Sequence, residues 1–448
     1  MSSTKKTFWN FVDHLKGDKV VWMITLMLIL VSIVCIFSST SRLLDAGQTR
    51  LDIVRSQLMV VMGGLALIVL CYNIRSIRFF RWCSKWGFLV SFVLLALLLS
   101  KINTPVLKSI ELNGARRILQ ILGFQVHVFE VVKVAMALYL AWALDAFSRK
   151  ELKYIKTPLW QKIVYIYAPF IVTMLMIIPG SNSAALLIGG IMFVIILLGG
   201  DNFRDMAILA LAAVLLIAAC FGVYKISDGK AMTRIGTGIS RVFEDTDWEK
   251  QVLESRTGSK DYYDALDEIR QPYGAKIALK EGGFFGKGPG QSTQRYVVPD
   301  MSEDYMYSFI IEEYGVLGAI VIIFLYVSLL ARASLIVRTC DGLYAKLAVA
   351  GLAILISGQA FLHMFVNADI GPMTGQTLPL ISHGNSAFLC FSLAFGVILS
   401  ISRISSNNLK KMQAAAEPIM EIQETEAALS DLDAFESGEM KMEEDENL

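Results

Sequence analysis

A cluster of acidic residues follows a glycine-rich stretch in the second half of the chain. The stretch reads GKGPGQSTQRYVVPD from Gly286 to Asp300, and Glu303 and Asp304 come soon after it. The dipole of a helix favours carboxylates at its N-terminus, so helix capping alone could explain one or two of these acids. A well-positioned carboxylate can also act as a general base. This cluster is therefore the first candidate for chemistry.

The glycines before the acids raise a second possibility. GKGPG does not match a phosphate-binding Walker motif, because Gly288 follows Lys287 where that motif needs Ser or Thr. A turn of exposed backbone N–H groups can nevertheless bind a phosphate or a sugar. Lys287 and Arg295 would assist such binding, and we count both among the candidate substrate-binding residues. The alternative is a flexible loop without a site.

Two adjacent arginines, Arg116 and Arg117, stand in the sequence NGARRIL. A pair of guanidinium groups beside a glycine turn suits the recognition of a diphosphate. Arginines at a membrane surface also anchor to lipid headgroups, so the sequence leaves both interpretations open.

Four charged residues lie inside apolar runs, where a charge is costly and a functional role is the default hypothesis. Glu312 and Glu313 lie about two helical turns beyond Asp304. Glu130 and Lys133 are three residues apart on one helical face, so we expect them to neutralise each other or a neighbouring group. We predict that all four belong to a structural polar core.

The stretch LPLISHGNSAF, residues 378–388, is dense in Pro, Gly, Ser and Asn. That composition indicates broken backbone, which at membrane depth is tolerated only against protein or a water-filled cavity. With the arginines and acids, it predicts a cavity that faces outward. Ser382 and Glu303 are further candidates for substrate binding there.

The elements that must position these residues are membrane-spanning helices. The chain has 448 residues, of which 55% are hydrophobic and only 18% charged. Its apolar runs are long enough to cross a hydrocarbon core of about 30 Å with about 20 residues each. We predict an all-α polytopic membrane protein with about ten spans. The spans are 21–38, 57–73, 86–100, 128–147, 162–179, 183–200, 205–224, 305–331, 343–366 and 380–402.

Lys and Arg in short loops set the orientation. They concentrate at the N-terminus, in 74–85, in 148–162, after the eighth span and after the tenth. The positive-inside rule places all these segments in the cytoplasm, so both termini are cytoplasmic. The opposite segment 101–127 is also basic, which suggests that its charges have a function.

This topology divides the chain into five parts. They are a cytoplasmic segment 1–20, seven spans in 21–224, an extracytoplasmic loop 225–304, three spans in 305–402 and an acidic tail 403–448. We expect a helix over Asp261–Arg270 within the loop, and a disordered cytoplasmic tail. The six cysteines show no paired spacing and are interpreted as buried thiols.

The order of these landmarks resembles the SEDS family (shape, elongation, division and sporulation) over roughly residues 20–405. GGFFGKGPGQSTQRYVVPD, EDYMYSFIIEEYGVLG and VNADIGPMTGQTLPLISHGNSAF are similar to three family motifs. Carried over position by position, the family's proposed catalytic Asp falls on Asp304, and its paired glutamates fall on Glu312 and Glu313. The chain is more similar to division-type than to elongation-type members.

The chain also departs from the family pattern. Ile118 replaces the Trp after the double Arg, His127 begins HVFE in place of QPSE, and Gly180 replaces an Asp. Ser302 and Glu303 replace the His and Thr before the catalytic Asp. The C-terminal half therefore matches the family better than the middle of the chain does.

The resemblance implies a peptidoglycan glycosyltransferase that polymerises lipid II for septal wall synthesis in the bacterial inner membrane. Asp304 would be the catalytic base. Arg116, Arg117, Lys287 and a divalent cation (Mg²⁺ or Mn²⁺) would hold the diphosphate, although we predict no metal-ligating residues. The implied partners are lipid II, a class B penicillin-binding protein that acts as transpeptidase, and other divisome membrane proteins, but no nucleic acid.

Three alternatives stay open: a lipid II flippase, an elongation-type polymerase and an inactive scaffold for a transpeptidase. A flippase should line its cavity with charge through the whole membrane depth, whereas most charges here gather near the outer face. The departures at Ile118, His127 and Gly180 keep the scaffold in consideration.

Overall fold

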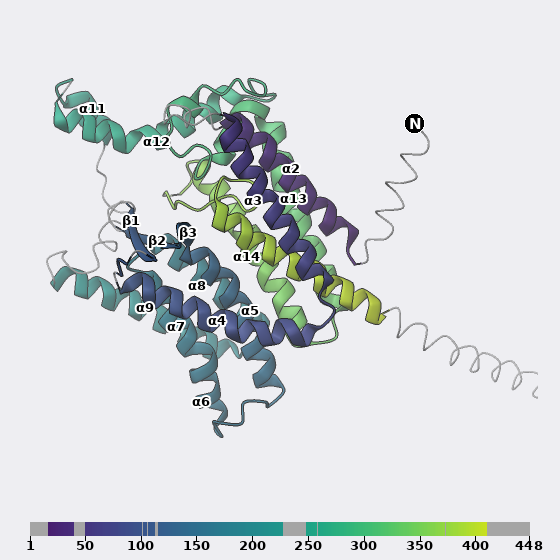
Figure 1. Cartoon of the computed structure of the whole chain (residues 1–448). Helices are drawn as coiled ribbons and strands as arrows, with labels where there is room; N and C mark the ends of the chain where they lie inside the picture. Colours follow the sequence, from purple (N-terminus) through teal and green to yellow (C-terminus); the bar gives the residue numbers. More distant parts are fainter. Residues whose placement is uncertain are drawn as a thin grey trace, which may run out of the picture.

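A computed structural model describes residues 17–39, 50–100, 102–104, 106–112, 115–226, 248–257, 259–371 and 373–409. Helices dominate these ranges (Figure 1). The longer ones are α2 (Lys19–Ser39), α3 (Arg50–Asn73), α4 (Ile77–Leu99), α5 (Val128–Ser148), α7 (Ala168–Ile177), α8 (Asn182–Leu198), α9 (Phe203–Ile226), α12 (Lys260–Gly282), α13 (Met306–Thr339), α14 (Leu343–Asn367) and a C-terminal helix (Asn385–Leu409). Short pieces are α6 (Pro158–Lys162), the π-helix η2 (Ile163–Tyr167), α11 (Trp248–Glu254) and the 3-10 turn η3 (Gln294–Tyr296). Residues 403–409 of the predicted acidic tail belong to the C-terminal helix, whereas the rest of the tail and most of the predicted N-terminal segment lie outside the described residues.

Helices form at all ten positions predicted for spans. Eight helices in the described part of the chain are long and apolar enough to cross a membrane. The helix α8, with 17 residues, is shorter than these eight. The chain is thus a polytopic helical membrane protein, and the count of ten spans stays a prediction. The third span begins at Ile77 instead of 86, because the helix continues through the basic residues before its apolar part.

The centre of the bundle is formed by α5, α14 and the C-terminal helix, whose apolar stretches are the most buried of the spans. The helix α14 packs against α13, α5 and α8. Small residues permit this contact: a Cβ at Gly351 of α14 would lie 2.8 Å from the Ile195 side chain of α8. These buried helices carry most of the polar residues discussed below.

The loops predicted to be cytoplasmic meet at one end of the bundle. Arg332 at the end of α13 pairs with Asp18 at 2.6 Å, before the start of α2. Arg403 donates to the carbonyl of Tyr72 at 3.0 Å, at the end of α3. Asp145, in the last turn of α5, pairs with Arg81 of α4 at 2.8 Å. We call this the basic end, and the opposite end of the bundle the outer end.

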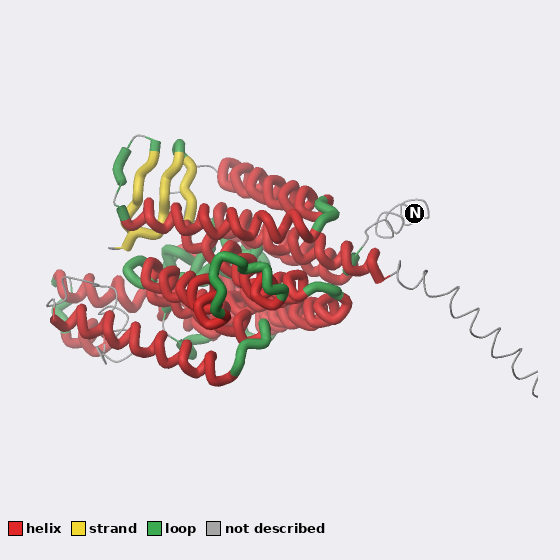
Figure 2. Tube along the Cα trace, turned by 90° about the horizontal axis from the view of Figure 1, so that it is seen from below, coloured by secondary structure: helices red, strands yellow, loops and turns green. Residues whose placement is uncertain are grey.

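The outer end carries a small antiparallel sheet that the all-α prediction missed. Its strands are β1 (Leu107–Leu112), β2 (Ala115–Ile121) and β3 (Phe124–His127), in the order β1-β2-β3 at one edge of the bundle (Figure 2). Leu122 and Gly123 join β2 to β3, and both have positive φ, of 51° and 91°. Two such residues are typical of a tight hairpin turn.

The segment predicted as a long extracytoplasmic loop contains helices of its own. Helix α12 includes the predicted stretch Asp261–Arg270, and Ser259 caps it by accepting from the N–H of Tyr262 at 3.2 Å. In Figure 1, α11 and α12 lie across one end of the bundle. Arg270 donates to the carbonyl of Val297 at 2.8 Å, which fixes α12 to the chain that leads to the acidic cluster.

Candidate active site

Asp304 stands two residues before α13, and three contacts fix the backbone around it. The hydroxyl of Ser382 donates to the carbonyl of Glu303 at 2.7 Å, and the amide of Asn367 donates to the carbonyl of Asp304 at 3.0 Å. The N–H of His383 donates to the carbonyl of Ser302 at 2.8 Å. The position of the carboxylate is therefore set by the end of α14 and by the segment before the C-terminal helix.

Arg117 and Asp304 approach each other across Gly375. A Cβ on Gly375 would lie 3.3 Å from Oδ2 of Asp304 and 3.7 Å from Nη1 of Arg117. Gly375 has a φ of 58°, a conformation that favours glycine. A small cavity of about 10 Å³ borders Asp304, with walls that include His363 and Gln376. This volume is about that of one water probe.

The surroundings of Asp304 change its proton affinity. Burial first, and then the nearby charges of Glu303 and Asp300, raise the pKa of this carboxyl to about 7, while Arg117 opposes them. A general base works best when its pKa is near the working pH. The environment of Asp304 therefore suits a group that exchanges a proton near neutrality, rather than one that is fully ionised there.

The two arginines predicted to act as a pair have different surroundings. Between β1 and β2 the register shifts, so Glu111 is paired with Arg116 and Ile110 with Ile118. Arg117 is the extra residue of this bulge, and such bulges often re-aim a side chain near a site. Arg116 contacts Glu111 at 3.4 Å, whereas Arg117 donates to the carbonyl of Gly180 at 3.2 Å.

Glu130 and Lys133 form the ion pair that the sequence predicts. The Lys133 ammonium lies 2.6 Å from Oε1 of Glu130, 2.7 Å from Oε1 of Gln359 and 2.8 Å from Oε1 of Gln376. Lys133 is buried and thereby connects α5, α14 and the segment after α14. These contacts agree with a structural role.

His363 of α14 is held in one orientation. Its Nδ1 lies 2.7 Å from the carbonyl of Gln376, and its Nε2 accepts from the N–H of Tyr307 at 3.3 Å. These contacts assign the proton to Nδ1. His363 therefore ties the start of α13 to the wall of the small cavity.

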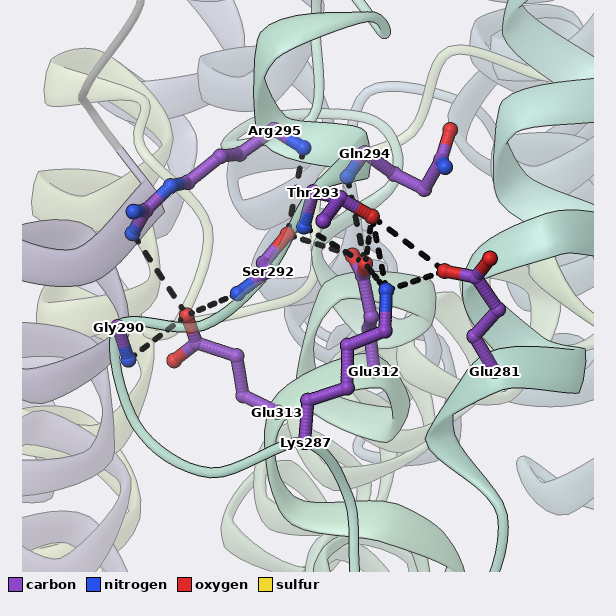
Figure 3. Close-up of polar contacts among 9 residues, drawn as sticks. All are labelled: Glu281, Lys287, Gly290, Ser292, Thr293, Gln294, Arg295, Glu312 and Glu313. Atoms are coloured by element: carbon purple, nitrogen blue, oxygen red, sulfur yellow. Dashed lines mark hydrogen bonds and ion pairs between the residues drawn. The ribbon is translucent and has the colours of Figure 1, made fainter.

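The glycine-rich segment binds the chain's own carboxylates (Figure 3). Glu312 and Glu313 are completely buried in the first turns of α13. Glu312 accepts from the N–H of Thr293 at 2.8 Å and from Ser292, while Glu313 accepts from the N–H of Gly290 at 3.0 Å and from Ser38 at 2.6 Å. The exposed N–H groups expected to meet a phosphate or a sugar are thus used by two internal glutamates.

The same segment replaces two hydrogen bonds of α13. The helix is broken at Gly315, which has a φ of 69° and a ψ of −169°. The carbonyls of Glu312 and Glu313 accept from the N–H groups of Lys287 and Gly288, at 2.8 and 3.0 Å. In return, Val316 donates to the carbonyl of Gly283 at 3.0 Å. The backbone around the break in α13 is therefore paired with protein, as a broken helix within a membrane requires.

Three residues predicted to bind substrate contact other groups of the chain itself. Lys287 contacts Glu281, Glu312 at 2.8 Å and Thr293 at 2.8 Å. Arg295 donates to the carbonyl of Ser38 at 2.8 Å, lies 3.8 Å from Glu313 and stacks on Tyr296. The hydroxyl of Ser382 holds the backbone of Glu303, as described above. Each of the three side chains thus helps to fix the chain near the acidic cluster, and their substrate-binding role stays a prediction.

Glu303 and Arg116 remain at the accessible side of the site. The side chain of Glu303 is 47% exposed, and its Oε1 lies 3.3 Å from Nδ1 of His383. The N–H of His127 donates to Ser386 at 3.1 Å, which joins the sheet to the C-terminal helix near this pair. Both Glu303 and Arg116 keep the substrate-binding role as a prediction.

The sequence reading missed several residues that build the site. His363, Asn367, Gly375 and Gln376 all lie in or beside VNADIGPMTGQTLP, a stretch noted only for its similarity to a motif. Gln359 gave no signal, because one amide in an apolar helix is common. Within the described ranges, no group of three or more His, Cys, Asp or Glu side chains could hold a metal ion. The structure therefore assigns no residues to the Mg²⁺ or Mn²⁺ considered above.

Together, the fold and this site define a class: a polytopic helical membrane protein with a polar, carboxylate-centred site at the outer end of its bundle. The particular family follows from comparison of the sequence. The chain belongs to the FtsW/RodA/SpoVE family of cell cycle proteins, whose sequence model matches residues 18–407. This match confirms the resemblance seen in the sequence.

Individual relatives are named probable peptidoglycan glycosyltransferase FtsW. The one from Thiomicrospira cyclica is 27% identical over 393 residues, which are 85% of this chain and 90% of the relative. The one from Coxiella burnetii is 29% identical over 340 residues, 74% of this chain and 81% of the relative. The one from Enterococcus hirae is 27% identical over 408 residues, 86% of this chain and 93% of the relative.

Two solved structures share the fold. One is described as "Structural coordination of polymerization and crosslinking by a peptidoglycan synthase complex" and has a TM-score of 0.62 at 20% identity. The other is the rod shape determining protein RodA of Thermus thermophilus, with a TM-score of 0.55 at 20% identity. In both cases the similarity covers 87% of this chain and 98% of the other.

Proposed function

We propose that this chain is a peptidoglycan glycosyltransferase that joins lipid II units into glycan strands for septal wall synthesis during cell division. Its family and the names of its relatives support this activity. The observation that carries the proposed site is the position of Asp304: a carboxyl with a pKa of about 7, next to Arg117, at the outer end of the bundle.

In the proposed reaction, the GlcNAc 4-hydroxyl of one lipid II attacks the anomeric carbon of the growing strand. Asp304 accepts the proton of this hydroxyl while the new C–O bond forms. The bond between the anomeric carbon and the diphosphate breaks, so undecaprenyl diphosphate leaves and the configuration is inverted. Arg117 lies where a guanidinium can stabilise the negative charge that develops on this leaving group.

The proposed setting is the bacterial inner membrane, with the basic end in the cytoplasm and residues 225–304 outside. Both termini are then cytoplasmic. The proposed partner is a class B penicillin-binding protein, with other divisome membrane proteins nearby. The description of the related synthase complex, which couples polymerisation to crosslinking, supports a transpeptidase partner.

The distribution of charge favours a polymerase over a lipid II flippase. In the described helices, the charged side chains lie close to the two ends of the bundle. Glu130, Lys133 and Glu312 lie in the first turns of their helices at the outer end, and Asp145 and Arg332 lie in the last turns at the basic end. A flippase would need polar surface along the path between these two ends.

The decisive experiment uses the full chain, purified with its class B penicillin-binding protein. Labelled lipid II is added while the transpeptidase is blocked by a β-lactam, and the products are separated by size. We expect long glycan strands. If only unreacted lipid II remains with a correctly assembled complex, the inactive scaffold replaces the polymerase. Exchange of the division partner for an elongation partner tests the division assignment.

A further inference from the structure

A second cavity lies at the basic end, far from Asp304. Its volume is about 550 Å³. The walls come from the first turns of α4, the last turns of α5, the loop after α5, and η2. The reaction proposed above does not use this cavity.

The cavity is lined mainly by cations and aromatic rings. Arg78, Arg81 and Lys85 line it, against the single carboxylate of Glu151. Arg81 already pairs with Asp145 at 2.8 Å and with Glu151 at 2.7 Å. Within the part of the chain that the structure describes, Arg78 and Lys85 make no ion pair, and Lys85 lies over the Trp142 ring at 5.3 Å. Two positive charges are therefore available to an anion.

One wall is shaped by a rare element. Tyr165 lines the cavity from η2, a π-helical turn within the fifth span. The hydroxyl of Tyr139 donates to the carbonyl of Tyr165 at 3.1 Å, and the Tyr139 ring stacks on Phe88 of α4 with centroids 4.1 Å apart. Such π-turns occur frequently at functional sites. The wall is thus held in place by contacts from two neighbouring helices.

The cavity borders an apolar surface on the face of α4 that points away from the bundle. Trp82 lines the cavity and is 54% exposed, and Trp86, Leu89 and Val93 follow it at helical spacing with 52%, 48% and 47% exposed. In a membrane protein this stripe faces lipid, and tryptophans mark the level of the headgroups. A ligand that fits both the basic cavity and the apolar stripe of α4 has an anionic head and apolar chains.

We propose that this cavity binds the phosphate headgroup of an anionic phospholipid, such as phosphatidylglycerol, from the leaflet at the basic end. Arg78 and Lys85 contact the phosphate, the tryptophans lie at the headgroup level, and the acyl chains lie along Trp86, Leu89 and Val93. Basic pockets between transmembrane helices recognise lipid headgroups in this manner. Free phosphate has the same charged group as the lipid headgroup, but it has no acyl chains to contact the apolar stripe of α4.

Native mass spectrometry of the full chain in detergent measures the binding. Phosphatidylglycerol is titrated against phosphatidylcholine with the same acyl chains, and inorganic phosphate and a polyglutamate peptide are added as competitors. The test variant is Arg78→Ala/Lys85→Ala, and Arg78→Lys/Lys85→Arg is its conservative counterpart. Arg75→Ala/Arg338→Ala removes the same charge from exposed positions that do not line the cavity, and serves as control.

We expect the test variant to bind phosphatidylglycerol at least about tenfold more weakly. The control and the conservative variant should bind it as the unchanged chain does, and all variants should keep the same melting temperature. Equal binding of phosphatidylcholine, or an equal loss in the control, would overturn the proposal. Displacement of the lipid by phosphate or by the acidic peptide at comparable concentration would replace it with a site for that ligand. Should the test variant melt earlier, the comparison of the two lipids on the unchanged chain decides.

Discussion

At Asp304, the position of the carboxyl and its proton affinity have different causes. Ser382 and Asn367 hold the backbone, whereas burial and neighbouring acids raise the pKa to about 7. Asp304→Asn keeps the size and removes the basicity, so polymerisation should fall by about 10²–10⁴-fold with normal yield. Glu303→Ala and Asp300→Ala should be milder. Strand synthesis by Asp304→Asn within about threefold of the unchanged enzyme would move the base elsewhere, with Glu303 as the next candidate.

The raised pKa of Asp304 also predicts a pH dependence. The base is active only when deprotonated, so the rate should rise as the pH increases through about 7 and then level off. Because the folded-state pKa lies above the ordinary value, the charged form is disfavoured by folding, and stability is lost as the pH rises through about 7. Asp304→Asn should therefore melt at least as high as the unchanged chain at pH 8. A rate that is flat between pH 6 and 8 would contradict this assignment.

Replacement of Arg117 should reduce polymerisation more than replacement of Arg116. Arg117 faces Asp304 across Gly375, whereas Arg116 contacts the exposed Glu111 at 3.4 Å. We expect Arg117→Ala to reduce polymerisation by about tenfold or more, as for the loss of a charged contact to the leaving group. Arg116→Ala should change the rate by less than about threefold, since exposed ion pairs contribute little. Titrations with lipid II measure the rate and the apparent affinity of both variants. Equal losses would mean that Arg116 and Arg117 bind the diphosphate together.

Some of this site could be predicted from the sequence, and some could not. The motif resemblance indicates Asp304 as the candidate base, which stays a prediction, and helical spacing predicted the Glu130–Lys133 pair that the structure contains. The contacts of Lys287, Arg295 and Ser382 within the chain could not be predicted, because their partners lie in other elements: Arg295, for example, contacts Ser38, far away in the chain. Residue type shows what a side chain can bind, but only the fold shows what it already binds.

Among the elements, the glycine-rich segment offers a sharp test. A Cβ at Gly286 would lie 2.3 Å from the carbonyl oxygen of Glu313, whereas nothing lies within 4 Å of a Cβ at Gly290. Both glycines have similar φ, 80° and 78°, so the conformational cost of Ala is about 1–2 kcal/mol in each case. Gly286→Ala should lower the yield of folded protein and its melting temperature far more than Gly290→Ala. Equal effects would mean that the segment does not pack against α13 as described.

The polar contacts of Lys133 link three elements, so its loss should act on folding. Lys133→Glu would bury repelling carboxylates beside Glu130 and leave Gln359 and Gln376 without their donor. Breaking a buried ion pair in this way costs about 3–5 kcal/mol. Folded yield in detergent should fall more than the specific activity of the protein that remains. The control is Lys276→Glu, at a pair with Asp369 that is about half exposed. Normal yield with abolished activity would place Lys133 in the catalytic machinery.

Hydropathy predicted where the helices lie, because long apolar runs need a bilayer. It did not predict the sheet at 107–127, since those strands are short and only their pairing makes them regular. The break at Gly315 and the π-turn η2 were also missed. Both lie within continuous apolar runs. The break at Gly315 is paired with the backbone of residues 283–288, and η2 accepts one hydrogen bond from Tyr139 of α5.

Across the whole molecule, the two ends of the bundle differ in structure. The basic end closes with ion pairs such as Asp18–Arg332 and carries the cavity of about 550 Å³. The outer end brings together β2, the start of α13, the end of α14 and the segment before the C-terminal helix. The sequence predicted this division from its loop charges, but the convergence at Asp304 involves parts of the chain separated by more than half its length.

The break in α13 has a consequence for the order in which the protein is made. Residues 283–288 supply the backbone partners that α13 lacks around Gly315, and Gly290 and Thr293 supply partners for its two glutamates. The ribosome delivers this segment before α13 exists. Its backbone groups therefore lack these partners until α13 has been translated. Residues 283–296 and the eighth span thus mature in a single late step, and the site at Asp304 cannot form earlier than that step.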